Sequence, residues 1–296
     1  MKNTKIIVKT KSKSYPIYFG DRILDTAGTL INKNLPNVKK ICIICDKNLP
    51  LVLTKKLSKS LRKYNPKFYL LPAIEKTKSF EVAKKIIGFL LKNNFNRSDC
   101  IIAFGGGILG DLSGFISSLT KRGVKFINIP TTLLAQADAS IGGKTGINSN
   151  QGKNLIGTFY QPEFVLTDIS MLNSLSRREM ICGYGEILKH SLIIDKKFFL
   201  WLSKNAKKII NNKDKNLLAM AIMKSCKIKS QIVSRDEKEQ KLRMKLNFGH
   251  TFAHGFEGVK NFSKKLNHGE AVLLGMMTAS ELSSKKNYYH LKNCHK

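Results

Sequence analysis

Apolar and polar positions alternate in short blocks over the first part of the chain. Four apolar runs predict strands, at residues 39–46, 67–73, 98–104 and 124–132. Between them, segments 51–64 and 79–94 place apolar side chains three and four positions apart, as on one face of a helix. Residues 1–20 predict two further short strands. Strands that alternate with helices indicate a doubly wound parallel sheet.

The pattern changes after residue 170. From there the apolar spacing is helical, over residues 177–194, 196–211, 214–234, 246–261 and 268–286. We therefore predict an α/β domain with a parallel, Rossmann-like sheet over residues 1–170 and an all-α domain over residues 171–296. A crevice between two such domains is the expected position of a ligand site.

A glycine-rich turn joins the strand at 98–104 to the helix that follows it. In IIAFGGGILGDL, Gly105, Gly107 and Gly110 match G-x-G-x-x-G in a strand–turn–helix context. Such glycines let the backbone approach a diphosphate, and the helix N-terminus supplies free N–H groups. The acidic residue expected about twenty positions later for a ribose is absent from RGVKFINIP. The turn therefore differs from the usual dinucleotide fingerprint, and a purely structural turn is the alternative.

The next segment, residues 129–162, is rich in threonine, glycine, lysine and asparagine and has few helix signals. Its donors suit phosphate and hydroxyl groups, and they are Thr131, Thr132, Lys144, Lys153 and Asn154. Asp138 is a lone carboxylate among them. We favour a ligand-binding loop over a solvated one, because two Gly-Lys units occur close together.

Histidines are concentrated near the end of the chain. In LNFGHTFAHGFE, His250 and His254 are four residues apart, so one helix face can present both to a metal. Glu186 in GYGEILKH and His268 in NHGEA offer a carboxylate and an imidazole from other helices. Two imidazoles and a carboxylate form a zinc site with open positions for substrate oxygens. Core histidines bonded to the backbone are the alternative.

Charge and composition narrow the class of protein. Hydrophobic residues make up 42% of the 296 residues, as expected for a globular chain. The formal net charge is +32, but lysine outnumbers arginine by 44 to 8 and the lysines are spread along the chain. Nucleic-acid readout favours clustered arginine forks, so we expect no nucleic-acid partner. A diffuse basic surface still attracts phosphorylated small molecules.

Targeting and cysteine patterns add two expectations. The apolar runs are too short to span a bilayer, and the N-terminus lacks the apolar region of a signal peptide. We therefore expect a cytoplasmic protein without a membrane partner. Cys42 and Cys45 lie within the apolar run ICIIC, which predicts a buried strand and argues against a redox or zinc pair.

Six motifs occur together and in a consistent order. They are GGGILGDLSGF, RGVKFINIPTTLLAQADASIGGKTGIN, GKNLIGTFYQP, GYGEILKH, LNFGHTFAHGFE and HGEAVLLGM. With them, residues 40–285 resemble the 3-dehydroquinate synthase family of sugar-phosphate cyclases. The resemblance implies the fold of that family, with catalytic NAD and Zn2+ or Co2+ as cofactors, a small sugar-phosphate substrate and a homodimer.

The resemblance also implies roles for individual residues. Glu186, His250 and His268 would bind the metal, and His254 would remain free to transfer a proton. The substrate and its phosphate would contact Lys189, Lys144, Asn154, Arg243, Asn247, Arg122 and Asp138. Lys229 and Glu239 also match substrate-pocket positions. Arg122 would act across the dimer, in the site of the partner subunit.

For NAD, the matching positions are spread over several loops. They are Asp46, Asn48, Glu75, Lys78, Gly107, Ile108, Leu109, Gly110, Asp111, Thr131, Thr132, Lys144, Lys153, Met171, Leu172, Asn173 and Ser174. Glu75 together with Asp46 would supply the ribose contact that the glycine turn lacks.

The family reaction is a phosphate-eliminating cyclisation. 3-Deoxy-D-arabino-heptulosonate 7-phosphate would be oxidised transiently at a ring hydroxyl, lose phosphate, be reduced again and close to 3-dehydroquinate by an aldol step. The protein would thus be a carbon–oxygen lyase of the shikimate pathway. A related sugar-phosphate cyclase, a metal-dependent polyol dehydrogenase and a non-catalytic remnant are the alternatives.

The chain departs from the family pattern at two places. Ile74 stands where the family has a glycine, and a β-branched residue tolerates positive φ poorly, so we expect a reshaped loop and weaker NAD binding. The last residues, ELSSKKNYYHLKNCHK, differ from the family, whose members continue further. We therefore expect a truncated or decaying form with part of its helical core exposed.

Overall fold

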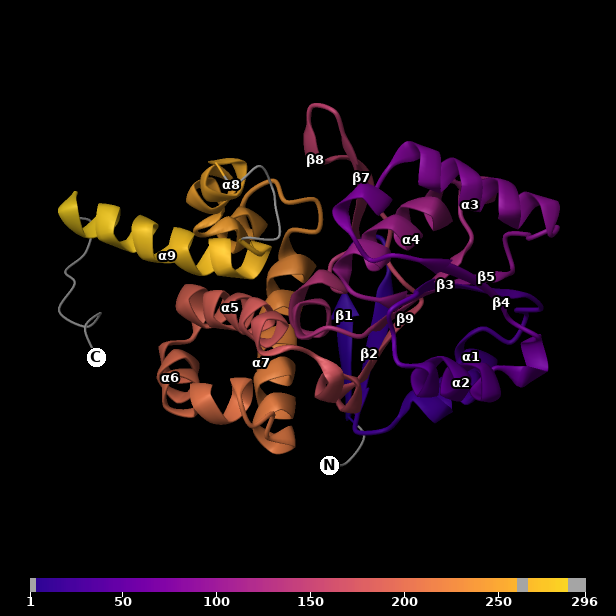
Figure 1. Ribbon diagram of the computed structural model, residues 1–296, viewed down its shortest axis with the longest axis horizontal. Coiled ribbons are helices and arrows are strands. Elements are labelled where there is room, and N and C mark those ends of the chain that lie inside the picture. Colours follow the sequence, from indigo (N-terminus) through magenta and orange to yellow (C-terminus); the bar gives the residue numbers. More distant parts are fainter. Residues whose placement is uncertain (1–3, 260–265, 287–296) are drawn as a thin grey trace.

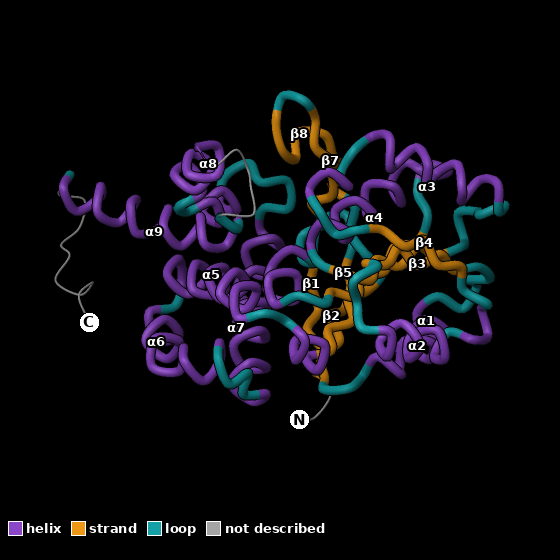
Figure 2. The backbone as a smooth tube through the Cα atoms, viewed as in Figure 1, coloured by secondary structure: helices purple, strands orange, loops and turns teal. Residues whose placement is uncertain are grey.

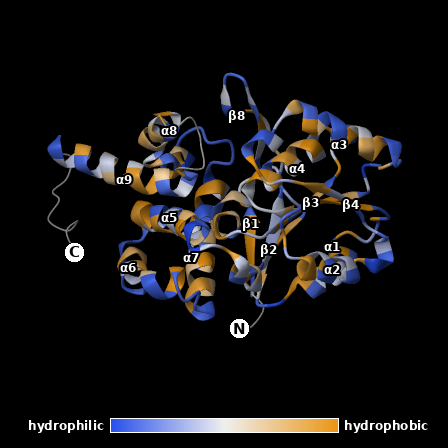
Figure 3. Ribbon diagram, in the orientation of Figure 1, coloured by the Kyte–Doolittle hydropathy of each residue, from blue (hydrophilic) through white to orange (hydrophobic). Residues whose placement is uncertain are grey.

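The computed structural model describes residues 4–259 and 266–286. Figure 1 shows two parts side by side, a sheet with helices on both faces and a group of helices that follows it in the sequence. The hydropathy colouring in Figure 3 alternates along these helices, which is the amphipathic pattern from which they were predicted.

One seven-stranded sheet forms the centre of the first part. Its spatial order is β1 (Thr4–Lys9), β2 (Ser14–Gly20), β9 (Phe164–Asp168), β6 (Lys125–Pro130), β5 (Cys100–Gly105), β3 (Ile41–Asp46) and β4 (Lys67–Leu71). Neighbouring strands are parallel except for β1 and β2, which form an antiparallel pair. Parallel strands need crossover helices, and these cover the two faces.

The four crossover helices are α1 (Ala27–Asn34), α2 (Leu51–Ser60), α3 (Phe80–Lys92) and α4 (Gly107–Leu119). α1 and α2 pack on one face of the sheet with Ile43 and Cys45, and α3 and α4 pack on the other with Cys42 and Ile44. Side chains alternate along a strand, so the two cysteines point to opposite faces. The buried-strand interpretation is confirmed, and burial raises the pKa of each of these thiols to about 12.

The second part contains α5 (Arg177–Ile194), α6 (Lys196–Ile210), α7 (Lys215–Arg235), α8 (His250–Val259) and α9 (His268–Lys285). α5 packs against α6, α7 and α9, and α7 contacts β1. One apolar core therefore includes Val8 and Ile17 of the β1–β2 pair together with Ile187 and Phe198 of the helices. Helix and sheet meet through this shared core.

The predicted fold class is confirmed, with some elements added. α1 and β9 were not predicted, and residues 144–159, expected as a loop, form the hairpin of β7 (Lys144–Ser149) and β8 (Gly152–Phe159). Figure 2 shows this hairpin projecting from the body of the molecule. A π-helix spans Ala135–Ala139, and the expected helix at 246–261 begins only at His250, after a 3₁₀ turn at Leu242–Asn247.

Two further expectations concern the surface. Ile74 has φ −124°, ψ 155°, so it is extended and does not need the positive φ that would disfavour a β-branched residue. Val259, Leu274, Met277 and Leu282 are exposed apolar side chains on or beside α8 and α9 within the described residues.

Among the same residues, none of the helices has the length and apolar character needed to cross a membrane.

Candidate active site

The carboxyl ends of the central parallel strands meet at one edge of the sheet. β3 ends at Asp46, β5 at Gly105 and β6 at Pro130, directly before Thr131. Open α/β sheets bind ligands at this edge, because the loops that leave the strands converge there. α4 begins at Gly107 in the same place, so its N-terminal N–H groups face the edge.

Three helices bring a carboxylate and two imidazoles together next to this edge. Glu186 lies in the middle of α5, while His250 and His268 are the first residues of α8 and α9. One ligand atom from each of these residues lies within 4.8 Å of the others, close enough for one metal ion. His254 is one turn further along α8, with its ring centre 5.7 Å from that of His250, and it is exposed.

The charges around this cluster suit a metal cation. Burial alone would raise the pKa of Glu186, but Lys189 beside it holds the carboxyl below its ordinary value, so it stays ionised. Burial and the positive charge of Lys189 lower the pKa of His250 to about 4. Glu186 Oε1 is buried and has no hydrogen-bond partner among the described residues. An ionised carboxylate with an unsatisfied oxygen and a neutral imidazole are the donors that Zn2+ or Co2+ needs.

A second carboxylate supports His268 from outside the cluster. Glu257 of α8 is 3% exposed, and its Oε1 lies 3.5 Å from His268 Nδ1. Burial would lower the pKa of His268, but Glu257 and Glu186 raise it. The same Glu257 oxygen lies 3.5 Å from Lys153 Nζ of the β7–β8 hairpin. A ligating histidine commonly gives its other N–H to a carboxylate, which fixes the ring.

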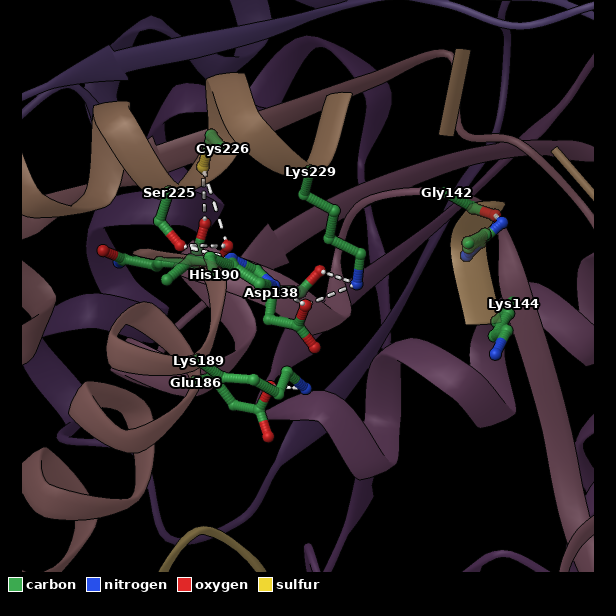
Figure 4. A network of polar contacts seen from close by, with 12 residues as sticks. Asp138, Gly142, Lys144, Glu186, Lys189, His190, Ser225, Cys226 and Lys229 are labelled. Carbon is green, nitrogen blue, oxygen red and sulfur yellow. Dashed lines mark hydrogen bonds and ion pairs between the residues drawn. The ribbon is translucent and has the colours of Figure 1, made fainter. Parts of the chain in front are cut away.

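Asp138 lies beside the cluster at the centre of a polar network (Figure 4). Its Oδ1 is 2.6 Å from Lys229 Nζ and 3.0 Å from His190 Nε2, and Lys229 also donates to the Asp138 carbonyl at 3.0 Å. Burial would raise the pKa of Asp138, but Lys229 and His190 hold it well below its usual range. The π-helix places this carboxylate, and π-turns are frequent at functional sites.

Cationic side chains surround the turn after this π-helix. Arg243 is 1% exposed, and its Nη1 donates to the carbonyls of Gly142 at 2.9 Å and Glu237 at 2.5 Å. Gly142 has φ +93°, and a Cβ there would meet Arg243 Nη2 at 2.4 Å, so this close approach requires glycine. Lys144, the next cation along the turn, is half exposed and pairs with Glu239.

Glu239 joins two of the predicted substrate residues. It pairs with Lys144 and accepts a hydrogen bond of 3.0 Å from Asn247 Nδ2. Asn247 is exposed, whereas Lys189 is 3% exposed and lies against Glu186. Of the predicted cations, Lys189 is therefore buried against the metal cluster, whereas Lys144 lies at the surface of the turn.

Lys78 links α4, the helix after the glycine turn, to the hairpin. Lys78 is buried, with Nζ 2.7 Å from Asp111 Oδ2 on α4 and in contact with Asn154 of β8. Burial raises the pKa of Asp111, although Lys78 opposes this. Thr131 is buried beside Gly105, to whose carbonyl its N–H donates at 3.0 Å, and Thr132 Oγ1 accepts from Ala135 N at 3.2 Å.

The other positions predicted for NAD lie in loops at the same edge or directly after it. Asp46 Oδ1 accepts from the N–H of Asn48 at 3.0 Å, and Glu75 accepts from Asn148 Nδ2 at 2.8 Å. Others belong to the first turn of α4 or to the 3₁₀ helix Ile169–Ser174, namely Gly107, Ile108, Leu109, Gly110, Met171, Leu172, Asn173 and Ser174. The side chains of Leu109, Met171 and Leu172 are buried in the core, so only their main chains can meet a ligand.

Arg122 is not brought to this site within one chain. It is exposed in the turn Thr120–Arg122 after α4, directly before β6 begins. That turn lies at the amino end of β6, whereas Thr131 and Thr132 follow its carboxyl end. Arg122 therefore lies across the sheet from the other predicted residues.

Three residues of the site, His190, Ser225 and Glu257, were not predicted from the sequence. His190 and Glu257 were present in the quoted motifs GYGEILKH and LNFGHTFAHGFE. The i+4 spacing of His190 from Glu186 was a usable signal, since it places both side chains on one helix face. Ser225 had no such signal, because its contact with His190 joins two helices.

Comparison with known proteins identifies relatives for both parts of the chain. A family model described as 3-dehydroquinate synthase N-terminal matches residues 68–182, and one described as 3-dehydroquinate synthase C-terminal matches residues 183–296. The 3-dehydroquinate synthase of Pelagibacter ubique (strain HTCC1062) is 52% identical over 279 residues, which cover 94% of this chain and 76% of the relative. The expectation of a decaying form is not borne out, since nearly the whole chain aligns at this identity, and the chain spans about three quarters of the relative's length.

Solved structures of sugar-phosphate cyclases share the fold. 2-epi-5-epi-valiolone synthase from Streptomyces hygroscopicus subsp. jinggangensis 5008, solved with NAD+ and Zn2+ bound, is 27% identical with a TM-score of 0.83, over 94% of this chain and 76% of that one. 2-Deoxy-scyllo-inosose synthase, complexed with carbaglucose-6-phosphate, NAD+ and Co2+, is 24% identical with a TM-score of 0.84, over 96% of this chain and 76% of that one.

Proposed function

The chain belongs to the 3-dehydroquinate synthase family, and on this premise we propose how its residues perform the family reaction. It is a phosphate-eliminating lyase that converts 3-deoxy-D-arabino-heptulosonate 7-phosphate into 3-dehydroquinate and phosphate with catalytic NAD and a divalent metal. The observation that carries the assignment of residues is the convergence of Glu186, His250 and His268 beside Asp138, at the strand edge that bears the glycine turn.

Glu186, His250 and His268 would hold the metal, and the loops around Gly107, Asp46 and Glu75 would hold NAD. When bound, these groups would supply reversible hydride transfer and polarisation of a substrate oxygen. The ionised Glu186 and the neutral His250 are ready to bind a cation without first losing a proton. The buried Lys189 lies within reach of the same place and orients the hydroxyl or carboxylate groups of the substrate.

The cations of the turn bind the anionic groups of the substrate. Arg243 and Lys144 attract the phosphate, and Asn247 and Asn154 offer amide donors for it and for a hydroxyl. Asp138 accepts a hydrogen bond from a substrate hydroxyl. His254 is exposed beside the metal ligands and is not one of them. It therefore transfers a proton to or from the substrate. Close positioning of these groups supplies much of the catalysis.

We further propose that the working protein is a cytoplasmic homodimer of two-domain chains, divided near residue 170. Arg122 precedes the amino end of β6, and Thr131 follows the carboxyl end of the same strand. Arg122 therefore reaches a substrate only in the site of a partner subunit. A guanidinium there would complete the phosphate site from outside the chain. Gel filtration of the wild type would show whether the dimer exists. Gel filtration of Arg122→Ala would show whether the dimer forms without this side chain.

The proposed function is tested by product formation. With heptulosonate phosphate, NAD and Zn2+, the wild type is expected to release phosphate and 3-dehydroquinate together, without accumulating NADH. Glu186→Gln should abolish both products, because it removes a charged metal ligand from a buried site. Glu281→Gln on the exposed face of α9 is the matched control and should keep full activity.

Other outcomes identify other functions. Net production of NADH from a polyol would indicate a dehydrogenase, and phosphate release from a different sugar phosphate would indicate a related cyclase. A folded chain that binds NAD and forms neither product would contradict the proposal.

A further inference from the structure

A buried histidine contacts Asp138 beside the metal ligands. His190 lies on α5 directly after Lys189, and its side chain is fully buried. Its Nε2 is 3.0 Å from Asp138 Oδ1, and its Nδ1 is 2.7 Å from Ser225 Oγ on α7. Figure 4 shows the imidazole between these two side chains. The roles proposed above leave it unused.

The neighbours of His190 decide which ring nitrogen carries the proton. Burial lowers the pKa of His190, although Asp138 opposes this, so the ring is neutral and has one N–H. Asp138 is held ionised and can only accept, whereas a serine hydroxyl can donate. The proton therefore lies on Nε2 toward Asp138, and Ser225 donates to Nδ1. The alternative acceptor for Ser225, the Ala137 carbonyl, is further away at 3.3 Å.

Two side-chain nitrogens thus lie close to the same carboxylate oxygen. Lys229 Nζ lies 2.6 Å from Asp138 Oδ1, and His190 Nε2 lies 3.0 Å from it. Lys229 Nζ also donates to the Asp138 carbonyl at 3.0 Å, so it binds both the backbone of the π-helix and the carboxylate. In Figure 4 the second oxygen of Asp138 points to the side on which Glu186 and Lys189 lie. That oxygen is the one available to a substrate.

We propose that His190, oriented by Ser225, is a positioning residue that fixes the Asp138 carboxylate so that its second oxygen faces the substrate. The inference rests on the proposed function, because Asp138 needs this orientation only if a polyhydroxy substrate binds beside it. His190 and Ser225 are buried behind Asp138 and act through it.

A second metal site at this place is the competing explanation. Ligand atoms of Asp138, Glu186 and His190 lie within 4.8 Å of one another. However, Lys229 Nζ lies 2.6 Å from Asp138 Oδ1, the oxygen that faces His190, so an ammonium group already neutralises this carboxylate. A cation at Oδ1 would face this positive charge at short range in a buried site. The contacts therefore favour a hydrogen-bonded network over a second ion.

Two substitutions of His190 separate its contact with Asp138 from its packing. A glutamine can place an N–H near the position of Nε2, whereas an asparagine is shorter and ends near Nδ1. We expect His190→Asn to lower kcat on the order of 10- to 100-fold, because a misplaced Asp138 loses its alignment with the substrate. His190→Gln should recover most of this loss, although both variants lose similar packing and melt at similar temperatures.

Substitutions on α7 provide a matched pair. Ser225→Ala removes the group that orients His190 and should lower kcat less than His190→Asn does. Ser230→Ala removes another buried hydroxyl from the same helix, one that has no hydrogen-bond partner among the described residues, and should leave kcat unchanged. Equal kcat in the asparagine and glutamine variants of His190 would overturn the proposal, as would equal effects of the two serine variants.

A spectroscopic measurement tests the same network without turnover. Nitrogen-15 spectra of histidine-labelled protein report which ring nitrogen is protonated, and His190→Asn identifies the signal by its loss. A proton on Nε2 supports the proposal, and a proton on Nδ1 overturns it. Absence of activity in the wild type would overturn the proposed function instead, and the spectrum would still decide the orientation of the ring.

Discussion

At the scale of single residues, burial and neighbouring charges set the protonation of the site. Glu186 and Asp138 are held ionised by Lys189 and Lys229, while burial keeps His250 neutral. These shifts act together, because each ammonium that stabilises a carboxylate also disfavours an imidazolium nearby. The side chains therefore reach the states that metal binding and hydrogen bonding require before any ligand arrives.

Replacing Glu257 should weaken metal binding, which can be measured without turnover. Glu257→Gln removes the negative charge that faces His268 Nδ1, so the ring is less firmly oriented and less basic. Loss of such an outer partner typically weakens metal binding about 10- to 100-fold. Competition for Zn2+ or Co2+ with a chelating dye measures this Kd. Glu281→Gln is the control, and an unchanged Kd in Glu257→Gln would contradict the assigned role.

At the scale of elements, irregular segments place part of the chemistry beside the metal ligands of three α-helices. Asp138 lies on a π-helix, Arg243 on a 3₁₀ turn, and Lys153 and Asn154 on a two-stranded hairpin. The hairpin strands approach closely at Gly146 and Gly157, where a Cβ on Gly157 would meet the Thr145 carbonyl at 2.1 Å. Glycine is therefore needed there for steric reasons alone.

The turn that presents Arg243 depends on one carboxylate. Asp236 accepts from the N–H groups of Gln240, Lys241 and Arg243 at 2.8–3.0 Å. These bonds, first of all that from Arg243, lower the pKa of Asp236 from 3.8 to about 2. Because the folded pKa lies below the ordinary one, this stabilisation is complete above pH 3.8 and is lost as the pH falls through about 2.

Asp236→Asn should therefore lower the Tm at neutral pH, because an amide cannot accept all three bonds. The difference in Tm from the wild type should shrink as the pH falls from about 4 toward 2, since the wild-type carboxylate becomes protonated there. Scanning calorimetry over this range measures the effect. A difference that stays constant with pH would show that charge is not the cause.

At the scale of the whole molecule, the sheet and the helical part are joined by one core. Ile17 of β2 and Phe198 of α6 belong to the same buried cluster, and the single tryptophan, Trp201, packs against it. The metal cluster lies on α5, α8 and α9, whereas the glycine turn belongs to the sheet. Precise placement of the two halves of the site thus depends on this core.

Ile17→Ala tests that coupling. The deletion leaves a cavity in a fully buried position and should lower the free energy of unfolding by about 2–5 kcal/mol. Because the core is shared, Trp201 fluorescence and far-ultraviolet circular dichroism should shift to lower denaturant concentration together. A Trp201 transition unaffected by the substitution would show that the helical part unfolds independently.

The predictability of elements followed their length and periodicity. α5 was predicted at its observed bounds from its apolar spacing, and the structure shows a Ser176–Glu179 capping box at the start of its eighteen residues. α1 was missed because only Ala27 and Ile31 of its eight residues are buried, which is too few for a pattern. The β7–β8 hairpin was missed because its alternation is masked by polar side chains that serve contacts with Lys78 and the helical part.

The sequence by itself determined the fold class, the family and the residue types of the site. These are local properties, since buried strands, amphipathic helices, the glycine turn and the His250–His254 spacing are visible within short windows. Only the tertiary structure decided which of these side chains meet. Glu186 and His268 are more than eighty residues apart, and so are Asp138 and Lys229, because contacts between helices depend on packing and not on spacing. The role of His190 appeared only there, since its two partners come from different elements.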